Sequence, residues 1–382
     1  MGVVEARDMT PKPTRTQYPL YNARMHPAKP LLPALSLPEL RAHIVSMQQP
    51  DYRAKQIWDW MNKGVCRPDT MHNLPGELRR KLSEQFVCEP LTLMQRQVST
   101  DGTRKYLFQL ERGGMVETVL IPEEHRGTVC ISSQVGCVLD CPFCYTGTQK
   151  FEKNLLAGEI VAQVLAVKRD LQINPLPDNL HDTVTHIVYM GMGEPLANED
   201  GVYGSLQILL NADGLNLSRR RITVSTSGLT PQIQRLGETW PVNLAISLHA
   251  ASDTLRNELV PVNRKYPLHL LRQCLDMYPL SNQRHITLEY VMLAGVNDRR
   301  TDLDSLIQFV NPERERVNLI HFNPWPEAPY RGSSRQHMNE FAKDLIKKGI
   351  RATVRRSRGD DIMAACGQLK AAAGSVKVRQ HD

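Results

Sequence analysis

Three cysteines on one short stretch are the residues of this 382-residue chain best suited to chemistry. Cys137, Cys141 and Cys144 form a C-x3-C-x2-C pattern within the segment TVCISSQVGCVLDCPFCYTGTQ. Thiolates this close along the chain can point into one small volume, as the ligands of a metal centre do. The spacing therefore predicts a metal site built on three thiolates.

The number of cysteines indicates which metal centre is favoured. Structural zinc takes four protein ligands, usually two C-x2-C pairs or one such pair with a His pair about 12–15 residues downstream, and the sequence has no second pair at such a spacing. A [4Fe–4S] cluster held by three thiolates keeps one iron open for a ligand that is not protein. This pattern, with Phe143 before the last cysteine, is the signature of radical S-adenosylmethionine enzymes. The alternatives are a partial zinc site or three buried structural thiols.

The charge balance favours a polyanionic partner. The net charge is +7 and the pI is about 9.0, and a basic surplus of this size is typical of proteins that bind nucleic acid. Arginines cluster at 219–221 and in RATVRRSR at 351–358. These runs fit an RNA partner, although a solvated basic face is the simpler interpretation of either run alone.

No segment indicates a membrane or secretory location. Residues 1–33 hold six prolines and no apolar core of a signal peptide, and Ala6 breaks the myristoylation pattern. No stretch approaches the roughly 18 apolar residues that a spanning helix needs. Because several of the eight cysteines look reactive, we expect a reducing cytoplasm and no membrane partner.

The segments before the cysteines predict two small units. After a flexible extension (1–35), residues 36–95 read as a helical accessory domain, beginning with a Ser cap and a Glu three residues later in SLPELRAHIVSMQ. This domain either contacts RNA or serves as a structural cap. The alternating runs 105–110 and 116–121 predict a β-hairpin within residues 96–125.

The rest of the chain alternates strand-like and helical segments. We expect strands at 128–133, 184–190, 222–227, 242–248, 286–293 and 317–323. Strands separated by helices predict a parallel sheet with right-handed connections. Six strands are too few for an eightfold barrel, so the predicted fold class is α/β: a partial (βα)6 barrel (126–356) with the small N-terminal helical domain and a C-terminal segment (357–382). Such a barrel has a lateral opening for a macromolecule.

Polar residues stand where the predicted strands end, which is where barrels of this kind carry their chemistry. The cysteine loop follows the first strand, and the run GMGEP at 191–195 follows the second. Each feature alone is an ordinary turn or cap. Their common position predicts a single ligand site, and the remaining members are Ser225, Ser227, Ser247, His249 and Asn323.

Eight motifs in a fixed order carry a family resemblance: SSQVGC, the cysteine loop, MGMGEPL, STSG, AISLHA, EYVML-GVND, FNPWPEAPY and RGDDIMAACGQL. From about Ser36 to Leu369 the chain resembles the RlmN family of radical S-adenosylmethionine methyltransferases, which act on C2 of adenine in 23S rRNA and in the anticodon loop of tRNA. Departures are confined to Tyr145–Gly147, where many relatives have Ser-Thr-Ala, and to the N-terminal extension. The resemblance implies a [4Fe–4S] cluster on Cys137, Cys141 and Cys144, and S-adenosylmethionine at Gly193, Glu194, Ser225, Ser247, Leu248, His249 and Asn323.

The resemblance also implies three catalytic residues. Adenine C2 has no nucleophilic lone pair, so its methylation needs a carbon radical. Cys366, in AACGQ, matches the cysteine that first receives a methyl group from one S-adenosylmethionine; a 5′-deoxyadenosyl radical from a second then activates that group for addition to C2. Glu117 matches the acceptor of the C2 proton. Cys130 matches the resolving thiolate, which breaks the covalent protein–RNA adduct as a transient disulfide forms with Cys366.

Other interpretations remain open at this point. Cys130 and Cys366 can instead be inert buried thiols, as we expect for Cys66, Cys88 and Cys274. The related C8 methylation of the same rRNA nucleotide (Cfr-like) shares most motifs. A radical enzyme for a small molecule and a non-catalytic RNA-binding protein with a cluster or zinc are the more distant alternatives. For the favoured function we expect 23S rRNA and tRNA as partners, an external electron donor such as flavodoxin, and a monomer.

Overall fold

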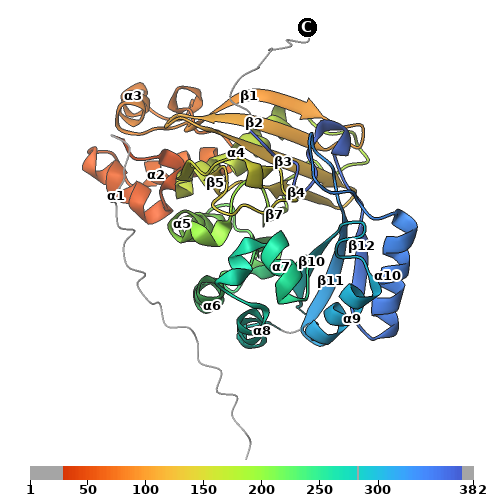
Figure 1. Cartoon of the computed structure of the whole chain (residues 1–382). Coiled ribbons are helices and arrows are strands. Elements are labelled where there is room, and N and C mark those ends of the chain that lie inside the picture. The colour runs from red at the N-terminus through yellow and green to blue at the C-terminus, as the bar shows by residue number, and fades with distance from the viewer. Residues whose placement is uncertain (1–28, 282–283, 372–382) are drawn as a thin grey trace, which may run out of the picture.

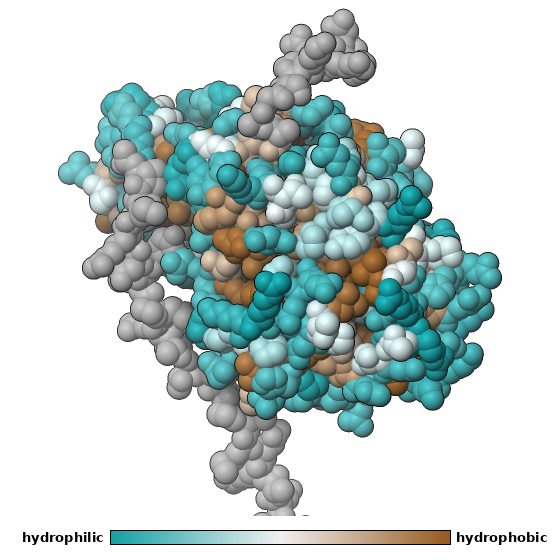
Figure 2. Space-filling model, in the orientation of Figure 1, coloured by the Kyte–Doolittle hydropathy of each residue, from teal (hydrophilic) through white to brown (hydrophobic). Residues whose placement is uncertain are grey.

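The computed structural model describes residues 29–281 and 284–371 (Figure 1). Most of the expected extension (1–35) and the end of the C-terminal segment (372–382) lie outside these residues. Figure 2 shows a mainly hydrophilic surface on one face, with apolar side chains gathered near the middle of the view.

One ten-stranded sheet organises the described chain, in the order β1-β2-β3-β4-β7-β8-β9-β10-β11-β12. From β4 to β12 every neighbouring pair is parallel, and β1 to β3 extend the sheet in antiparallel fashion. The order is a line rather than a ring, so the parallel part is a partial barrel. The strands are β1 Leu91–Val98, β2 Arg104–Leu110, β3 Met115–Glu123, β4 Arg126–Cys130, β7 His186–Tyr189, β8 Ile222–Thr226, β9 Asn243–Ser247, β10 Ile286–Met292, β11 Glu315–His321 and β12 Arg351–Arg355.

The α/β partial barrel is confirmed, and each of the six predicted strands is present with ends shifted by a few residues. The structure adds β12, which sequence analysis treated only as a basic run. In RATVRR the apolar residues are too few to mark a buried strand, yet every second residue points the same way. This alternation becomes important at the functional site.

Helices connect the parallel strands and cover the outer face of the sheet, as α10 does against β11 and β12 (Figure 1). Buried leucine, isoleucine and valine side chains fill the space between helices and sheet. Within the described residues, no helix is long and apolar enough to span a bilayer. The helices are α4 Ala157–Ile173, α5 Glu199–Leu209, α6 Thr230–Thr239, α7 Asp253–Leu259, α8 Leu268–Met277, α9 Arg300–Phe309 and α10 Arg335–Lys347.

The helical unit before the sheet consists of α1 (Leu37–Ser46), α2 (Tyr52–Asn62) and α3 (Gly76–Gln85). The predicted cap is present: the Ser36 N–H donates to Glu39 Oε2 at 2.7 Å, and the Glu39 N–H donates to Ser36 Oγ at 3.4 Å. Helical structure ends at α3, so the expected boundary at residue 95 falls inside β1. The expected hairpin, β2 and β3, is one part of a three-stranded antiparallel extension that continues into β4.

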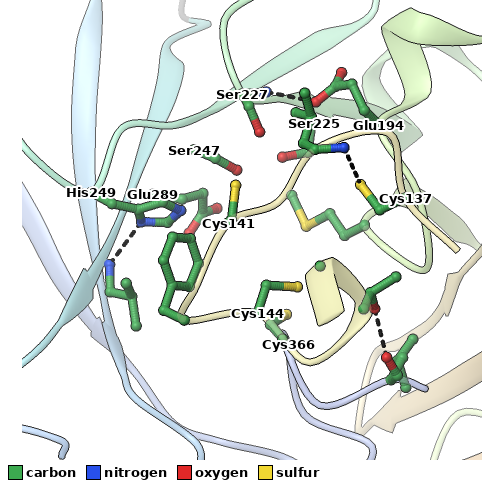
Figure 3. Close-up of a pocket in the computed structure, with 18 of the residues that line it drawn as sticks. Cys137, Cys141, Cys144, Glu194, Ser225, Ser227, Ser247, His249, Glu289 and Cys366 are labelled. Carbon is green, nitrogen blue, oxygen red and sulfur yellow. Dashed lines mark hydrogen bonds between the residues drawn. The ribbon is translucent and has the colours of Figure 1, made fainter. Parts of the chain in front are cut away.

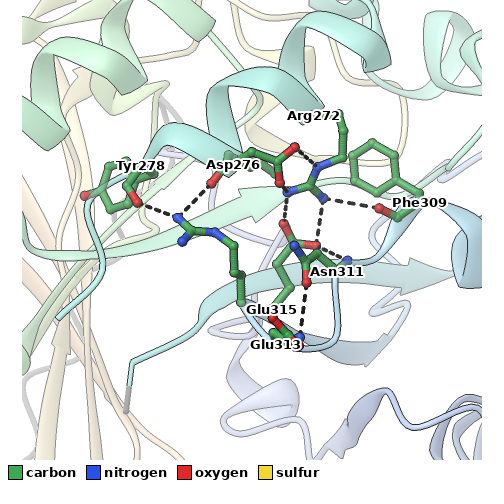
Figure 4. A network of polar contacts seen from close by, with 9 residues as sticks. Arg272, Asp276, Tyr278, Phe309, Asn311, Glu313 and Glu315 are labelled. Carbon is green, nitrogen blue, oxygen red and sulfur yellow. Dashed lines mark hydrogen bonds and ion pairs between the residues drawn. The ribbon is translucent and has the colours of Figure 1, made fainter. Parts of the chain in front are cut away.

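A buried ion pair fixes α8 to the start of β11 (Figure 4). The Glu315 side chain is fully buried, and its carboxylate accepts hydrogen bonds from the Arg272 guanidinium and, at 2.9 Å, from the Asn311 N–H. Arg272 also donates to Asp276 at 2.9 Å and to the Phe309 carbonyl at 3.2 Å. The pair therefore joins three segments of the barrel wall.

We expect Arg272→Met to lower the free energy of unfolding by about 3–5 kcal/mol, because the Glu315 charge would stay buried without its cation. Arg300→Met is the matched control. Arg300 is exposed and pairs with Asp304 and Asp344, so its loss should cost less than about 1 kcal/mol. Urea denaturation of both variants measures the difference. Equal losses would mean that the buried pair contributes no more than a surface pair.

Candidate functional site

One cavity at the carboxyl ends of the parallel strands gathers most of the predicted site residues (Figure 3). The strand direction explains this, because successive parallel strands all end at the same rim. Of the predicted residues, only Leu248, Glu117 and Cys130 are absent from its wall. Those that line it are Cys137, Cys141, Cys144, Gly193, Glu194, Ser225, Ser247, His249, Asn323 and Cys366, together with Ser227.

The thiols of Cys137, Cys141 and Cys144 surround one part of this cavity (Figure 3). None is in a disulfide. Burial raises the pKa of Cys137 to about 12, and burial followed by the neighbouring thiols raises the pKa of Cys141. Without a metal the thiols are therefore uncharged, and a bound cationic centre would deprotonate them.

The donor set fits an iron–sulfur cluster. Within residues 29–281 and 284–371, no three His, Cys, Asp or Glu side chains are arranged to hold a single metal ion. The three thiols line one shared space (Figure 3), which suits a cluster because each thiolate binds a different iron.

The GMGEP turn after β7 is tied to the cysteine loop. Gly193 has φ +97°, and a Cβ built there would lie 2.5 Å from Gln134 Cβ. The Gln134 side chain accepts a hydrogen bond from the Glu194 N–H at 3.0 Å. The Glu194 carboxylate is buried, which raises its pKa, and it accepts from the N–H groups of Leu196 at 3.1 Å and Ser227 at 2.9 Å. Glu194 thus holds the ends of β7 and β8 together.

A buried arginine that sequence analysis missed supports the ends of β8 and β9. The Arg256 guanidinium, on α7, donates to the carbonyls of Ser227 at 2.7 Å, Ser247 at 3.2 Å and Leu248 at 3.1 Å. The Leu248 side chain is fully buried away from the cavity. Only the backbone of Leu248 therefore contributes to the rim, through Arg256.

His249 lies at the rim as an uncharged side chain. Its Nδ1 accepts a hydrogen bond from the Val291 N–H at 3.1 Å, so any ring proton is on Nε2. Burial, followed by the nearby Arg256 charge, lowers the pKa of His249 to about 3. The ring lies edge-on to Phe143, 4.6 Å between centroids. The imidazole is therefore suited to stacking and to donating a hydrogen bond rather than to proton transfer.

The C-terminal tail brings Cys366 to the cavity that the three thiols line. Figure 3 shows Cys366 beside Cys144. Hydrogen bonds from the Tyr145 N–H to the Gly367 carbonyl (2.8 Å) and from Thr146 Oγ1 to the Leu369 carbonyl (2.6 Å) fix the tail on the cysteine loop. These contacts place Cys366 in the wall of the main cavity.

Cys130 and Cys366 share a second, adjoining cavity. Cys130 ends β4 and is 5% exposed, and burial, followed by the proximity of Cys366, raises its pKa. Two cysteines far apart in the sequence thus meet next to the three-thiol site. Both are free thiols.

Glu117 is buried on β3 but lines neither cavity. Its Oε1 lies 3.2 Å from Lys105 Nζ, and its Oε2 accepts from the Lys370 N–H at 2.9 Å. Burial raises its pKa, and the Lys105 cation opposes this shift. The tail segment around Lys370 covers the carboxylate, which separates Glu117 from the site.

Two further charged residues in the main cavity were not predicted. Arg355, on β12, lines both cavities, and its pKa is raised chiefly by the adjacent Cys366. Glu289, on β10, has a pKa raised by burial and accepts from Asn318 Nδ2 at 2.7 Å. The sequence held a signal for each residue. Alternate residues of RATVRR face the same way, which could have marked Arg355, and Glu289 is a lone charge inside the apolar run ITLEYVML.

Known proteins match the chain along its whole length. The Radical SAM superfamily model matches residues 131–307, and the model of the ribosomal RNA large subunit methyltransferase N-terminal domain matches residues 32–88. The dual-specificity RNA methyltransferase RlmN of Rhodopseudomonas palustris (strain BisB5) is 44% identical, covering 100% of this chain and 98% of its own. That of Paracoccus denitrificans (strain Pd 1222) is 46% identical over 89% of this chain and 90% of its own.

A solved structure has the same architecture. A radical SAM methyltransferase from Sphaerobacter thermophilus superposes with a TM-score of 0.84 at 42% identity, over 90% of this chain and 100% of that one. Radical SAM proteins use a [4Fe–4S] cluster and S-adenosylmethionine, which agrees with the three-thiol cavity. The chain therefore belongs to the RlmN family of the radical S-adenosylmethionine superfamily.

Proposed function

We propose that the protein methylates C2 of an adenosine in 23S rRNA and in the anticodon loop of tRNAs. One observation carries the proposal: Cys130 and Cys366 share a cavity that adjoins the three-thiol site. Relatives that cover 93% and 100% of the chain are named dual-specificity RNA methyltransferases. A methyltransferase that acts on a nucleophilic atom needs no such pair of cysteines. An enzyme that methylates an unreactive carbon through a methyl-carrying cysteine needs both, one to carry the methyl group and one to release the product.

The bound cluster and S-adenosylmethionine would supply a radical able to take hydrogen from a methyl group. Cys137, Cys141 and Cys144 would hold the cluster. Around it, the backbone at Gly193 and the other predicted rim residues would orient S-adenosylmethionine: Glu194, Ser225, Ser247, Leu248, His249 and Asn323. Since Glu194 and Leu248 bond within the protein, their part is to shape the rim.

Cys366 is proposed to carry the methyl group. Its sulfur would attack the sulfonium methyl carbon, forming an S–CH3 bond as the carbon–sulfonium bond breaks. Arg355 lines the same wall, so its positive charge lies in the cavity where this sulfur would react. The methyl carbon is then held between the cluster thiols and the opening that RNA must reach.

Cys130 is proposed to release the product. Its thiolate would attack the Cys366 sulfur, forming the disulfide while the sulfur–carbon bond to the nucleotide breaks. The bond electrons pass to the methylene carbon, which takes up a proton and becomes the methyl group. Radical addition leaves one unpaired electron on the nucleotide adduct, and the oxidised cluster or another one-electron acceptor would have to take up this electron before release. That both cysteines line one cavity supports this approach.

Glu117 is proposed to accept the C2 proton. A buried carboxylate with a raised pKa is a stronger base than an exposed one. To reach the nucleotide, the tail at Lys370 must move away from Oε2. RNA binding is the event that we expect to cause this movement.

We also propose that the protein acts in the cytoplasm, where the RNA substrates named for its relatives occur, and that it works as a monomer. An external one-electron donor, such as flavodoxin, would reduce the cluster.

Gly193→Ala should lower the affinity for S-adenosylmethionine by about tenfold or more, because a Cβ 2.5 Å from Gln134 Cβ displaces the turn. Gly295→Ala is the control. Gly295 also has a positive φ of +72°, but nothing lies within 4 Å of the added atom, so we expect only a stability loss of about 1 kcal/mol. Equilibrium binding to anaerobically reconstituted protein measures both. Unchanged affinity in Gly193→Ala would remove the turn from the binding site.

The direct test of function uses reconstituted protein with S-adenosylmethionine, a reductant and unmodified ribosomal RNA. After digestion, mass spectrometry against standards should identify 2-methyladenosine. An 8-methyladenosine product would assign the C8 activity instead. Cluster-loaded protein that yields no methylated adenosine would contradict the proposed function.

A further inference from the structure

The first arginine run noted in the sequence (219–221) and the first arginine of the second run (Arg351) lie at the same end of the barrel. Strands β8, β10, β11 and β12 begin at the edge opposite the thiol cavity, and arginines stand at or near their first positions. All but Arg284, which is half-buried, are exposed. We call this set the basic edge: Arg219, Arg220, Arg221, Arg284, Arg316 and Arg351.

Carboxylates compensate the basic edge little in the described chain: the Arg316 charge acts on buried Glu289, without forming an ion pair with it. In the parts of the chain that the structure describes (29–281 and 284–371), none of its six guanidinium groups forms an ion pair with a carboxylate. Arginines just inside the same end differ. Arg272 is paired with Glu315, and Arg314 Nη2 donates to the Tyr278 carbonyl at 2.6 Å (Figure 4). The charge of Arg272 is thus neutralised inside the fold, whereas Arg284 and Arg316 of the basic edge donate to neutral groups, the Pro241 carbonyl at 3.3 Å and Thr287 Oγ1 at 3.0 Å.

Like charges are placed directly against each other within the basic edge. Arg316 and Arg351 are register partners on β11 and β12. The Arg351 guanidinium also contacts the His285 ring, and the pKa of His285 is lowered by burial and then by these two arginines. Adjacent like charges destabilise a sheet unless an anion is present. A bound polyanion would turn this repulsion into attraction.

We infer that the basic edge binds the phosphate backbone of the RNA substrate, at a distance from the adenosine that is modified. This inference rests on the proposed function. Strands β10 and β11 each span seven residues, so the edge lies roughly 20 Å from the rim. A large folded RNA reaches around the barrel wall over that distance, whereas an isolated hairpin seated at the rim does not.

Geometry disfavours an acidic electron donor as the occupant. A donor protein bound at the basic edge would be separated from the cluster thiols by the full strand length, again roughly 20 Å. Direct electron transfer over that path is slow. RNA needs only phosphate contacts there, and phosphates position a nucleic acid without reading its sequence.

The test compares two paired variants, Arg219→Gln/Arg220→Gln and Arg316→Gln/Arg351→Gln, with the control Arg335→Gln/Lys343→Gln. The control removes two exposed cations of α10 that form no ion pair within residues 29–281 and 284–371. Equilibrium binding is measured against a ribosomal RNA domain containing the target adenosine and against the isolated hairpin that carries it. Thermal denaturation verifies that each variant is folded.

For the large RNA we expect about a tenfold loss of affinity in each basic-edge variant. The plot of log K against log salt should become shallower by about 0.7–0.9 for each phosphate that the variant no longer neutralises. Hairpin affinity should stay within about twofold, and the control should bind both RNAs as the parent does.

Three results would overturn the inference: unchanged affinity for the large RNA, an equal loss for the hairpin, or unchanged RNA binding with slower reduction by an acidic flavoprotein. The last would assign the edge to a protein partner. Methylation of the ribosomal RNA domain by the parent protein is followed in parallel. Its failure would count against the proposed function, while the binding comparison would still decide the role of the basic edge.

Discussion

Cys366→Ala is expected to abolish methyl transfer to RNA, by more than about 10³-fold, while iron content and cluster absorbance stay as in the parent. The loss is this large because the side chain would form a covalent bond with the transferred carbon, and no other thiol in the described tail replaces it. Product formation is measured by mass spectrometry of digested RNA, and iron by chemical analysis of the same preparation.

Cys274→Ala is the matched control, since it removes a buried thiol on α8 whose contact is the Thr230 carbonyl at 3.4 Å. That variant should methylate RNA at a rate close to that of the parent. If Cys366→Ala still produces methylated adenosine, the methyl group does not pass through the tail, and a single-step transfer must replace the two-step mechanism.

Cys130→Ala is expected to trap the protein on its RNA. Without the resolving thiolate, the bond between the Cys366 sulfur and the nucleotide has nothing to break it. Denaturing gels should therefore show a covalent protein–RNA band that depends on S-adenosylmethionine and reductant, with turnover reduced by more than about 10²-fold.

Cys88→Ala controls for the loss of a thiol elsewhere, because Cys88 lies in the N-terminal region with its Sγ 3.9 Å from the Leu82 carbonyl. It should turn over without an accumulated band. Absence of a covalent species in Cys130→Ala under turnover conditions, together with normal product release, would remove Cys130 from the mechanism.

Local sequence patterns predicted the architecture well because a few neighbouring residues are enough to identify each strand. Apolar runs such as 286–293 must be buried on both sides of a parallel sheet, and this identifies β10 without tertiary information. Ser36 and Glu39 similarly define a helix start within four residues. The three cluster cysteines lie on one loop, so their convergence also follows from spacing alone.

Local sequence patterns could not predict the roles of residues that depend on contacts with distant parts of the chain. Cys366 and Cys130 meet only because the tail is fixed to the cysteine loop, and resemblance to a family was the only guide to them. Arg256 supports two strand ends from a helix, which no local spacing reveals. The basic run at 351–358 divides: Arg351 joins the basic edge, whereas Arg355 enters the cavity.

Glu117 is the predicted catalytic residue whose contacts agree least with its predicted role. Its type and motif indicate a base, yet its carboxylate is held by Lys105 and by the tail backbone outside both cavities. The sequence motif identifies Glu117 as a candidate base, but the position of its carboxylate in the fold determines whether it can reach the substrate. The tail that carries Cys366 also covers Glu117, so one movement would change the position of both groups.

S-adenosylmethionine with a fully deuterated methyl group provides the most direct test that Cys366 carries the methyl carbon. If the methyl group is first placed on Cys366 and then loses one hydrogen to the radical, the RNA product should hold two deuterium atoms, and 5′-deoxyadenosine should gain the third. Mass spectrometry of both products after a single incubation measures this. An RNA methyl group that keeps all three deuterium atoms would show direct transfer and contradict the role of Cys366 as methyl carrier.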